Sequence, residues 1–494
     1  MDPIVALAQR AFGVSYLYPY QRLVIANTLE GRSENARQIV VLPTGSGKTL
    51  CFTLPALVLD GITIVVYPLL ALMDDQLRRL ARSGVAARVL RGGRPASERT
   101  ALFDDLAAGR AHCLLASPEV LAGERVRDRL ARLPVAHLVV DEAHCVSEWG
   151  LTFRPTYLSL ATTIEAIDPC VVTAFTATAS PAVLEAMREI LFPNLRPRLV
   201  LADPDRPNIS YSVIECESKE ATLAELVRAG IERPAIVFCR SRKRVEAVGR
   251  ELAAVTGFER CGAYHAGLTP DERARIERWF FDSSDGILAA TCAYGMGVDK
   301  SNIRTVIHYE IPTTVEAFLQ ESGRAGRDNE AARSVVLWNA TDEPRETDAL
   351  RAARERVMLG YLSTDRCRRE YLMEALGAES GTCFGCDRCE EHEPGPIRAA
   401  REAAATARER TLRYIRRRRR VHGLGPTVQG LPIAWPESAR RELLTTLIST
   451  GAVHRYAHGP WKGRLAPGTT LGKRAPYEFD IADSERYCKL DKLD

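Results

Sequence analysis

No apolar stretch in this 494-residue chain approaches the ~20 residues needed to cross a bilayer. The longest candidate, Ile62 to Met73, is interrupted by Tyr67 and Pro68. The N-terminus, MDPIVALAQRAFG, lacks the basic start and the long apolar core of a signal peptide. These absences argue against a membrane-embedded or exported protein and predict a soluble, cytoplasmic one.

Lysine and net charge are also scarce. The sequence has 8 Lys against 59 Arg, and its formal net charge is only +4. A net charge this close to zero does not by itself indicate a polyanion partner, so evidence for such a partner must come from local patches of basic residues. The Arg excess is typical of GC-rich coding, which is commonest in bacteria, and arginine content is weak evidence for phosphate binding. The lysines that remain inside motifs, Lys48, Lys243 and Lys300, therefore carry more weight.

Two sets of short β-branched segments alternate with amphipathic stretches. The first set is QIVVL, ITIVVYPL, HCLLASP, AHLVVDEAH and CVVTAFTATA, and the second is AIVFCRS, CGAYHAG, GILAATCAYG, TVIHYEIP and SVVLWNA. Such alternation predicts parallel sheets wrapped by helices, so the fold class is α/β with two tandem domains. The Pro- and Asp-rich segment DPDRPN, residues 203–208, is typical of a linker between them.

These patterns divide the chain into four predicted parts. Residues 1–205 and 206–346 form the two α/β domains, and residues 347–393 form a helical subdomain that contains a cysteine cluster. Residues 394–494 form a small winged-helix-like module. In this last part we expect a helix from Ile397 to Val421, a second from Pro436 to Thr450, and a strand pair around Val453 and Leu465.

The segment PTGSGKT, residues 43–49, follows a predicted strand and precedes a predicted helix, which is the context of a phosphate-binding loop. Glycine at positions 45 and 47 lets backbone N–H groups approach phosphates. Lys48 can reach the β and γ oxygens, and the Thr49 hydroxyl can bind Mg²⁺. The predicted nucleotide-binding residues of this loop are Thr44, Gly45, Ser46, Gly47, Lys48 and Thr49.

Two adjacent carboxylates end an apolar strand in the same predicted domain. Asp141 and Glu142 follow the segment AHLVV. Phosphoryl transfer needs charge neutralisation and positioning of water more than covalent chemistry. We therefore assign Asp141, with Thr49, to Mg²⁺ and Glu142 to activation of the attacking water.

Four of the 13 cysteines lie close together in the sequence. Cys383, Cys386 and Cys389 form CFGCDRC, and Cys367 lies sixteen residues upstream of the first. In a reducing compartment four such thiolates favour a metal over disulfides, and their spacing suits structural Zn²⁺. A cysteine-ligated iron–sulfur cluster is the main alternative.

The motifs together resemble a known family. PTGSGKT, VVYPLLALMDDQ, DEAHCVSEWGLTFRP, FTATA, YHAGL, YGMGVDKSNIRTVIH and QESGRAGRDN are found in the order typical of superfamily 2 helicases, and they are similar to the RecQ DNA helicases in particular. The resemblance covers roughly residues 10 to 390. It implies two RecA-like domains, ATP as fuel, single-stranded and forked DNA as partners, and movement from 3′ to 5′.

The resemblance also assigns roles around the nucleotide. Gln21 matches the glutamine that reads adenine in this family, whereas Val14 and Tyr18 stand where an aromatic residue and an Arg usually enclose the base. Tyr20 replaces a Gly. Stacking of adenine on Tyr18 is the expected substitute. From the second domain, the resemblance implies that Gln320, Arg324 and Arg327 face the γ-phosphate, with Arg327 as the arginine finger.

The nucleic-acid contacts come from several segments. Residues 147–154 resemble the aromatic-rich loop that couples DNA contact to hydrolysis, in which Trp149 and Phe153 stack on bases and Arg154 pairs with phosphate. Further contacts are implied by resemblance alone. They are Ser117 with Pro118, Thr176 with Thr178, Arg240, Ser241 and Thr291.

The C-terminal module carries a run of five arginines, Arg416 to Arg420, which is either a solvated helix end or a nucleic-acid-binding face. His454, Tyr456, His458 and Trp461 are expected on a wing that parts the duplex. A protein partner is the other candidate ligand of this module.

The combined interpretation is an ATP-dependent DNA helicase of repair or recombination, associated with the bacterial nucleoid. The alternatives are a nucleic-acid-stimulated ATPase or translocase that acts in phage defence or on RNA, and a nucleic-acid-binding scaffold without ATP turnover.

Overall fold

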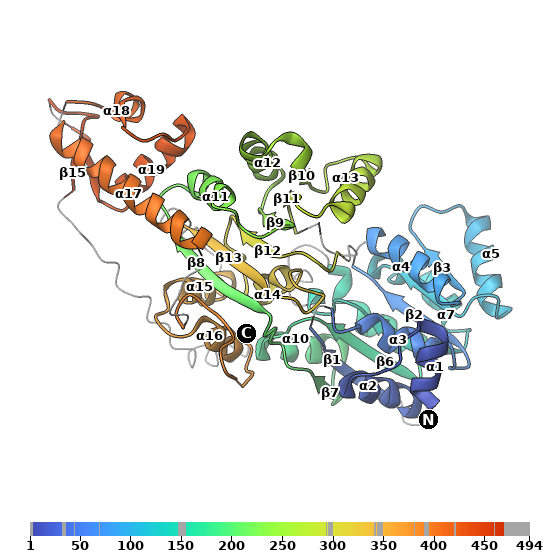
Figure 1. Ribbon diagram of the computed structural model, residues 1–494. Helices are drawn as coiled ribbons and strands as arrows, with labels where there is room; N and C mark the ends of the chain where they lie inside the picture. The colour runs from blue at the N-terminus through green and yellow to red at the C-terminus, as the bar shows by residue number, and fades with distance from the viewer. Residues whose placement is uncertain are drawn as a thin grey trace. The chain divides into compact units, whose positions relative to one another are not determined.

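The computed structural model describes residues 3–31, 36–43, 45–68, 70–146, 155–292, 294, 300–339, 342, 349–379, 381–389, 395–418, 421–458 and 460–468 (Figure 1). The chain divides into two compact units. Unit 1 comprises Met1–Asp205 with Leu376–Ala378, and unit 2 comprises Arg206–Ala375 with Glu379–Asp494. Among the described residues, no helix combines the length and the apolarity required to cross a bilayer.

Unit 1 is built on a seven-stranded parallel sheet in the order β3-β4-β2-β5-β6-β1-β7. Its inner strands are almost completely buried, because helices cover both faces, and this explains their largely apolar sequences. The strands are β1 (Ala36–Val41), β2 (Ile62–Val66), β3 (Ala87–Leu90), β4 (Cys113–Ala116), β5 (Val135–Val140), β6 (Val171–Thr176) and β7 (Arg198–Leu201).

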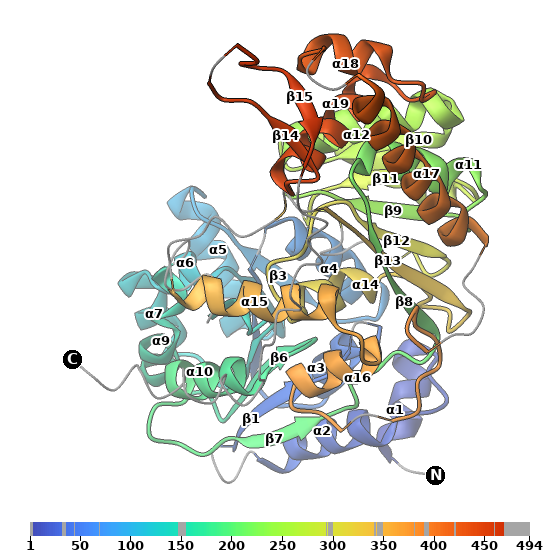
Figure 2. The ribbon, with the colours of Figure 1, turned by 90° about the vertical axis from the view of Figure 1, so that its left-hand side faces the viewer.

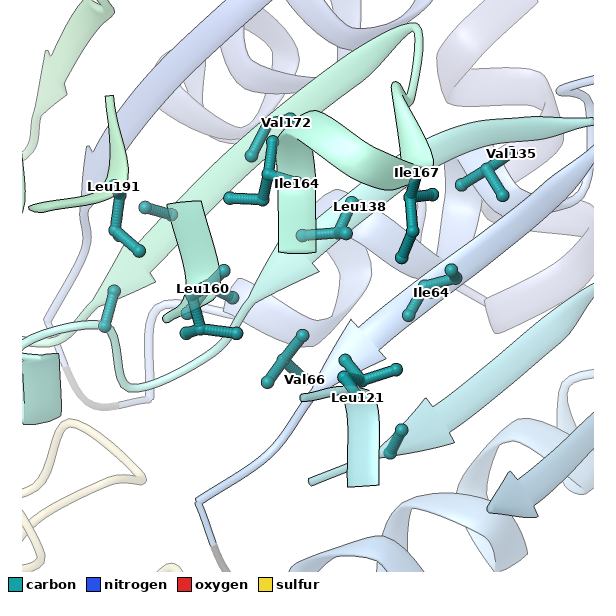
Figure 3. Close-up of a cluster of buried hydrophobic side chains, with 14 of the residues drawn as sticks. Ile64, Val66, Leu121, Val135, Leu138, Leu160, Ile164, Ile167, Val172 and Leu191 are labelled. Carbon is teal, nitrogen blue, oxygen red and sulfur yellow. The ribbon is translucent and has the colours of Figure 1, made fainter. Parts of the chain in front are cut away.

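The helices of unit 1 are amphipathic segments between these strands. On one face, Leu160, Ile164 and Ile167 pack with Leu138 and Val172 of the sheet (Figure 3). The helices are α1 (Pro3–Phe12), α2 (Pro19–Glu30), α3 (Lys48–Ala56), α4 (Leu70–Arg82), α5 (Ala96–Ala107), α6 (Pro118–Leu121), α7 (Glu124–Leu130), α9 (Leu160–Ile167) and α10 (Pro181–Leu191), with the 3-10 turn η2 (Pro155–Tyr157).

Unit 2 contains a six-stranded parallel sheet in the order β10-β11-β9-β12-β13-β8. Its strands are β8 (Ile209–Glu215), β9 (Ala235–Phe238), β10 (Cys261–Tyr264), β11 (Ile287–Ala290), β12 (Thr305–His308) and β13 (Ala332–Trp338). The helices that follow them are α11 (Lys219–Arg228), α12 (Arg242–Thr256), α13 (Pro270–Asp282) and α14 (Val315–Ser322), with the 3-10 turn η3 (Phe258–Arg260). The predicted α/β class with two parallel sheets is confirmed. Strands β3, β7 and β8 escape the sequence-based prediction.

The rest of unit 2 is mainly helical. Helices α15 (Ala349–Ser363) and α16 (Arg368–Ala375) precede the cysteine loop, and α17 (Gly395–Arg417), α18 (Leu424–Gly430) and α19 (Glu437–Ser449) follow it. Strands β14 (Val453–Arg455) and β15 (Leu465–Pro467) then pair antiparallel beside α19 (Figure 2). The two predicted C-terminal helices and the predicted hairpin are therefore present, with ends shifted by a few residues.

Helix α17 joins two hydrophobic cores. Ile397, Ala400 and Ala404 on its first half are buried in the core of the unit 2 sheet. Ala407 and Ile415 on its second half are buried in a separate core with residues of α18, α19, β14 and β15. One continuous helix thus carries the C-terminal module, which we define as residues 395–468, directly against the second sheet.

Candidate functional site

The phosphate loop leaves the carboxyl end of β1 and enters α3 at Lys48. Gly45 and Gly47 both have positive φ angles, 87° and 79°, which side chains with a Cβ rarely adopt. A Cβ at Gly47 would also lie 2.6 Å from Nε2 of Gln21. Backbone conformation therefore favours glycine at both positions, and crowding by Gln21 adds to this at Gly47. Thr44 lies outside the described residues.

Gln21 ties this loop to helix α2. Its Oε1 accepts a hydrogen bond from the backbone N–H of Tyr18 at 3.0 Å, and its Nε2 donates to the backbone carbonyl of Ser46 at 2.8 Å. The side chain is buried between these two partners. The predicted base-reading residue thus also fixes the phosphate loop against the segment that precedes α2.

The carboxylate pair lies at the same sheet edge, because β1, β5 and β6 run parallel next to one another. The Glu142 N–H donates to Oδ1 of Asp141 at 3.0 Å, and Glu142 has an unusual φ of 50°. Nζ of Lys48 lies 3.6 Å from Oε1 of Glu142. The structure therefore brings together the phosphate-loop lysine and the predicted water-activating residue.

The electrostatics of this pair fit a divalent cation. Burial, followed by the negative charge of Glu142, raises the pKa of Asp141 to about 6 despite the opposing charge of Lys48. Two close carboxylates repel each other, and a bound cation removes that repulsion. The residues present, with oxygen donors at Asp141 and Thr49, match the hard ligands that Mg²⁺ prefers.

His144 connects the carboxylates to strand β6. Its Nδ1 lies 3.0 Å from Oγ1 of Thr176 and 3.5 Å from Oε2 of Glu142, and the Thr176 hydroxyl donates to the backbone carbonyl of Thr178 at 2.9 Å. Thr176 is completely buried. The Thr176 side chain therefore connects His144 to the backbone carbonyl of Thr178 within unit 1. His144 was not among the predicted site residues, although it stands in the same DEAH segment.

A cavity of about 420 Å³ opens beside the phosphate loop, within the size range of small-molecule sites. Tyr16, Tyr18 and Gln21 line it together with the loop residues Gly45, Ser46, Gly47 and Thr49. Arg79 and Ser83 contribute from α4 and its C-terminal end. Arg79 and Ser83 could not be identified from the sequence, because their helix shows only an amphipathic pattern.

In unit 2, the loop after α14 is held by residues that directly precede β8. Gly326 has a φ of 57°, and its carbonyl accepts hydrogen bonds from Nη2 of Arg206 at 2.7 Å and from Nδ2 of Asn208 at 2.8 Å. Arg324 is buried and Arg327 is half-buried in this loop, while Gln320 is half-buried on α14. Gln320, Arg324 and Arg327 therefore lie on α14 and on the loop after it, which hydrogen bonds to Arg206 and Asn208 hold in place.

The predicted nucleic-acid-binding residues differ in their exposure, and some of them lie outside the described residues. Trp149, Phe153 and Arg154 lie outside the described residues. Arg240 and Ser241 are exposed, but Oγ of Ser241 accepts from the Arg244 N–H and so caps α12. Ser117 and Thr291 are buried. Lys300, retained in a motif, donates to the carbonyls of Phe281 and Ser283 and thereby stabilises the end of α13.

The four predicted metal ligands come together. Sγ atoms of Cys367, Cys383, Cys386 and Cys389 all lie within 4.8 Å of one another, and those of Cys367 and Cys386 are 4.0 Å apart. Tetrahedral Zn²⁺ with Zn–S bonds of ~2.3 Å places its sulfur ligands ~3.8 Å apart. The cluster therefore fits a single tetrahedral ion, whereas a multi-iron cluster would spread the ligands more widely.

Asp387, inside this cysteine loop, joins the metal centre to the rest of unit 2. Its carboxylate accepts from the guanidinium of Arg368, from Nη2 of Arg401 at 2.8 Å and from the Val213 N–H at 3.0 Å. Burial acts to raise the pKa of Asp387, but Arg368, Val213 and Arg401 outweigh it and lower that pKa below its usual value. The loop thereby packs against the edge strand β8, where the backbones of Tyr211 and Cys386 form an isolated β-bridge.

The C-terminal module exposes basic and aromatic side chains. Arg416, Arg417 and Arg418 are exposed at the end of α17, and residues 419–420 lie outside the described residues. His454 meets Tyr456 edge-on at 4.8 Å, and Trp461 is exposed nearby in sequence. His454, Tyr456 and Trp461 lie in the β14–β15 hairpin region, as expected from the sequence.

Two family models match the chain. A DEAD/DEAH box helicase domain matches residues 18–187, and a helicase conserved C-terminal domain matches residues 218–329. The chain is 32% identical to the ATP-dependent DNA helicase RecQ of Pasteurella multocida, over 76% of this chain and 61% of that protein. It is 36% identical to the probable ATP-dependent DNA helicase RecS of Bacillus subtilis, over 66% of this chain and 65% of that protein. The chain thus spans less than two thirds of the length of these relatives.

Solved structures share the fold. Mycobacterium smegmatis helicase Lhr bound to ssDNA and AMP-PNP matches with a TM-score of 0.55 and 20% identity, over 94% of this chain and 60% of that one. Helicase MrfA bound to DNA matches with a TM-score of 0.57 and 18% identity, over 98% of this chain and 64% of that one.

Proposed function

The chain belongs to the RecQ family of superfamily 2 helicases, and on this basis we propose that it couples ATP hydrolysis to movement along single-stranded DNA and to duplex unwinding. The observation that carries the proposal is the placement of Lys48 3.6 Å from Glu142, with Glu142 in turn beside His144. Lys48 for phosphate binding, Glu142 for water activation and His144 as a link to β6 thus lie within one small region.

The proposed chemistry follows from these residues. Lys48 and the backbone N–H groups of the loop bind the β- and γ-phosphates of ATP. Thr49 and Asp141 would hold Mg²⁺, which supplies charge neutralisation when bound. Glu142 orients the attacking water and accepts its proton. Gln320, Arg324 and Arg327 are proposed to contribute from unit 2, with Arg327 stabilising the charge that develops on the γ-phosphate.

DNA is the proposed track. The curated relatives named above are DNA helicases, and movement from 3′ to 5′ with a forked DNA substrate is proposed from the family. Trp149, Phe153, Arg154, Arg240 and Ser241 remain the proposed strand contacts. A role in repair or recombination is proposed on the same basis, within the bacterial nucleoid. Phage defence is the alternative role.

The metal is proposed to be zinc, because the four thiolates converge on a volume that suits one ion. The cluster includes no carboxylate or histidine ligand among the described residues, so a structural role is favoured over a catalytic one. Folding of residues 367–389 is then expected to depend on the metal.

The C-terminal module has a strongly basic composition. Residues 395–468 contain 15 Lys and Arg against 4 Asp and Glu, although the whole chain carries only +4. This local excess supports a polyanion ligand, and we propose duplex DNA ahead of a protein partner.

The test is one set of assays on the purified full chain. We expect ATPase activity that single-stranded DNA stimulates more strongly than RNA, and strand displacement on 3′-tailed and forked duplexes but not on 5′-tailed ones. Lys48→Ala and Glu142→Gln should each abolish both activities, while Glu142→Gln retains ATP binding. Stimulation by RNA alone would favour the RNA-remodelling alternative, and ATP turnover that is absent with every nucleic acid would favour the scaffold.

A further inference from the structure

Tyr67 is a buried tyrosine whose hydroxyl has no hydrogen-bond partner among the described residues. It directly follows strand β2, and only 1% of its surface is exposed. The large majority of buried side-chain polar atoms in proteins are hydrogen-bonded, so an exception calls for an explanation, such as a water molecule or an ion that binds beside it. The position of Tyr67 in the sheet indicates what binds there.

The strand register places Tyr67 beside Asp141. Val66 of β2 pairs with Val140 of β5, and the Asp141 N–H donates to the Val66 carbonyl at 3.0 Å. The ladder therefore continues past the two strands, and Tyr67 and Asp141 follow as the next neighbours on backbones about 4.8 Å apart. Both lie at the carboxyl edge of the sheet, from which the phosphate loop also starts.

The phenol and the carboxylate point to the face of the sheet that α3 covers. Successive side chains of a strand point to opposite faces. Val66 and Val140, which precede the two groups, belong to the core on the α9 face, where Figure 3 shows Val66. On the opposite face, Phe175 of β6 contacts Phe52 of α3 with ring centroids 5.6 Å apart. The phenol and the carboxylate thus point toward the helix that begins at Lys48.

The charges around the phenol agree with this placement. Burial, followed by the negative charge of Asp141, raises the pKa of Tyr67 well above its usual value, while the positive charge of Arg79 on α4 acts in the opposite direction. Tyr67 therefore keeps a neutral hydroxyl, which can donate one hydrogen bond and accept two. This hydroxyl makes no direct hydrogen bond to the neighbouring carboxylate, so a water molecule between them would hydrogen-bond to both.

We propose that the Tyr67 hydroxyl positions Mg²⁺ at the nucleotide site by accepting a hydrogen bond from one of the water molecules that the ion keeps. Mg²⁺ gives up its water molecules reluctantly and usually retains several of them in protein sites. Metal-bound water is a stronger hydrogen-bond donor than bulk water, because the cation lowers its pKa. The inference rests on the proposed Mg²⁺ site of Asp141 and Thr49 and adds a residue that sets the affinity for the metal.

The test is the Mg²⁺ dependence of nucleotide binding by the full chain, measured with a fluorescent ADP analogue that is labelled on the ribose. In Tyr67→Phe, the Mg²⁺ concentration that gives half of the maximal enhancement of binding should rise about 3- to 10-fold, as expected when one hydrogen bond is lost. Binding of the analogue in the presence of a Mg²⁺ chelator should not change, because the aromatic ring and its packing remain.

Thermal unfolding without Mg²⁺ separates this role from a structural one. Removal of a buried hydroxyl that has no partner should leave Tm unchanged or raise it. Tyr361→Phe is the matched control, because the Tyr361 hydroxyl of unit 2 is also completely buried and has no partner in the part of the chain that the structure describes. In this control, Tm should respond in the same way and the Mg²⁺ dependence should match that of the unchanged chain.

Two outcomes would overturn the inference in distinguishable ways. An unchanged Mg²⁺ dependence in Tyr67→Phe, with or without a lower Tm, would show that the hydroxyl does not act on the metal and would leave the proposed function intact. Nucleotide binding that does not respond to Mg²⁺ even in the unchanged chain would refute the proposed metal site together with the role of Tyr67.

Discussion

Arg401 of helix α17 donates a hydrogen bond from Nη2 to Oδ2 of Asp387 in the cysteine loop, at 2.8 Å. The same Nη2 also donates to the carbonyl of Val213 on strand β8, at 2.6 Å. One guanidinium therefore joins the C-terminal module, the metal centre and the edge of the second sheet. This arrangement makes the stability of the metal loop depend on a residue of the module that follows it.

Arg401→Ala should weaken the metal centre without touching any ligand. We expect a loss of about 1–2 kcal/mol in unfolding free energy, because a partly exposed, charge-assisted hydrogen-bond donor is removed from a buried carboxylate. Zinc transfer to a colorimetric chelator should accelerate in parallel. Arg398→Ala, an exposed arginine of the same helix, is the control. Equal zinc release from the two variants would contradict this coupling.

His144→Ala should separate basal hydrolysis from its stimulation by DNA. The imidazole links Glu142 to Thr176, and its removal breaks the connection between the carboxylate pair and the segment after β6. We expect DNA-stimulated ATPase activity to fall about tenfold, which corresponds to ~1.4 kcal/mol, with a smaller change in the basal rate. His112→Ala, at an exposed position of the same unit, should leave both rates unchanged. A proportional loss of both rates would assign His144 to the chemistry alone.

The fold was predictable wherever strands are buried on both faces. Segments such as Ile62–Val66 (ITIVV) and Val135–Val140 (VAHLVV) are mainly apolar runs rich in β-branched residues, because helices cover both sides of the sheet. Strand β3 contains Arg88, strand β7 is an exposed edge strand, and strand β8 mixes polar and apolar residues. None of these three has the continuous run that identifies a strand from sequence.

The candidate site was predictable where its chemistry is local in sequence. The phosphate loop, the carboxylate pair and the cysteine cluster each combine residue types that few other structures need at such spacing. The contacts that connect them are not local. Gln21 and Ser46 are 25 residues apart, His144 and Thr176 are 32 apart, and Val213 and Asp387 are 174 apart. Only the folded chain shows which of these distant residues meet.

Gly326→Ala tests whether the arginine loop must keep its conformation. A Cβ at Gly326 would lie 2.4 Å from Nδ2 of Asn208 and 2.8 Å from the carbonyl of Glu330, at a φ of 57°. The loop must shift, which displaces Arg324 and Arg327 from their positions. We expect kcat for ATP to fall at least tenfold with little change in ATP affinity, measured by steady-state kinetics and by nucleotide binding.

The matched control for this change is Gly230→Ala. Gly230 also has a positive φ, 86°, but a Cβ there would meet nothing within 4 Å. Both substitutions therefore introduce backbone strain of about 1 kcal/mol, and only the first adds a steric clash next to the arginines. If the two variants lost kcat equally, general destabilisation would explain the effect and the loop would have no special role.

Glu251 of helix α12 predicts a pH dependence of stability in unit 2. Burial, followed by the negative charges of Glu220 and Glu442, raises the pKa of Glu251 to about 7, against the opposing charges of Arg244 and Arg250. A carboxylate with a raised folded-state pKa stabilises the fold fully below its unfolded pKa, and this contribution is lost as the pH rises through about 7. Glu442, whose pKa burial also raises, belongs to α19, so the effect involves the contact between the second sheet domain and the C-terminal module.

We therefore expect Glu251→Gln to stabilise the protein at pH 8 and to have little effect at pH 4, because below the unfolded-state pKa the carboxyl group is neutral in both the folded and the unfolded protein. Partial exposure limits the gain to about 1 kcal/mol, or a few degrees in Tm. Glu259→Gln, at an exposed carboxylate of the same unit, is the control. Thermal unfolding of the three proteins at both pH values checks this. A gain at pH 4 as large as at pH 8 would show that the amide acts by packing or hydrogen bonding and not through the removal of a buried charge.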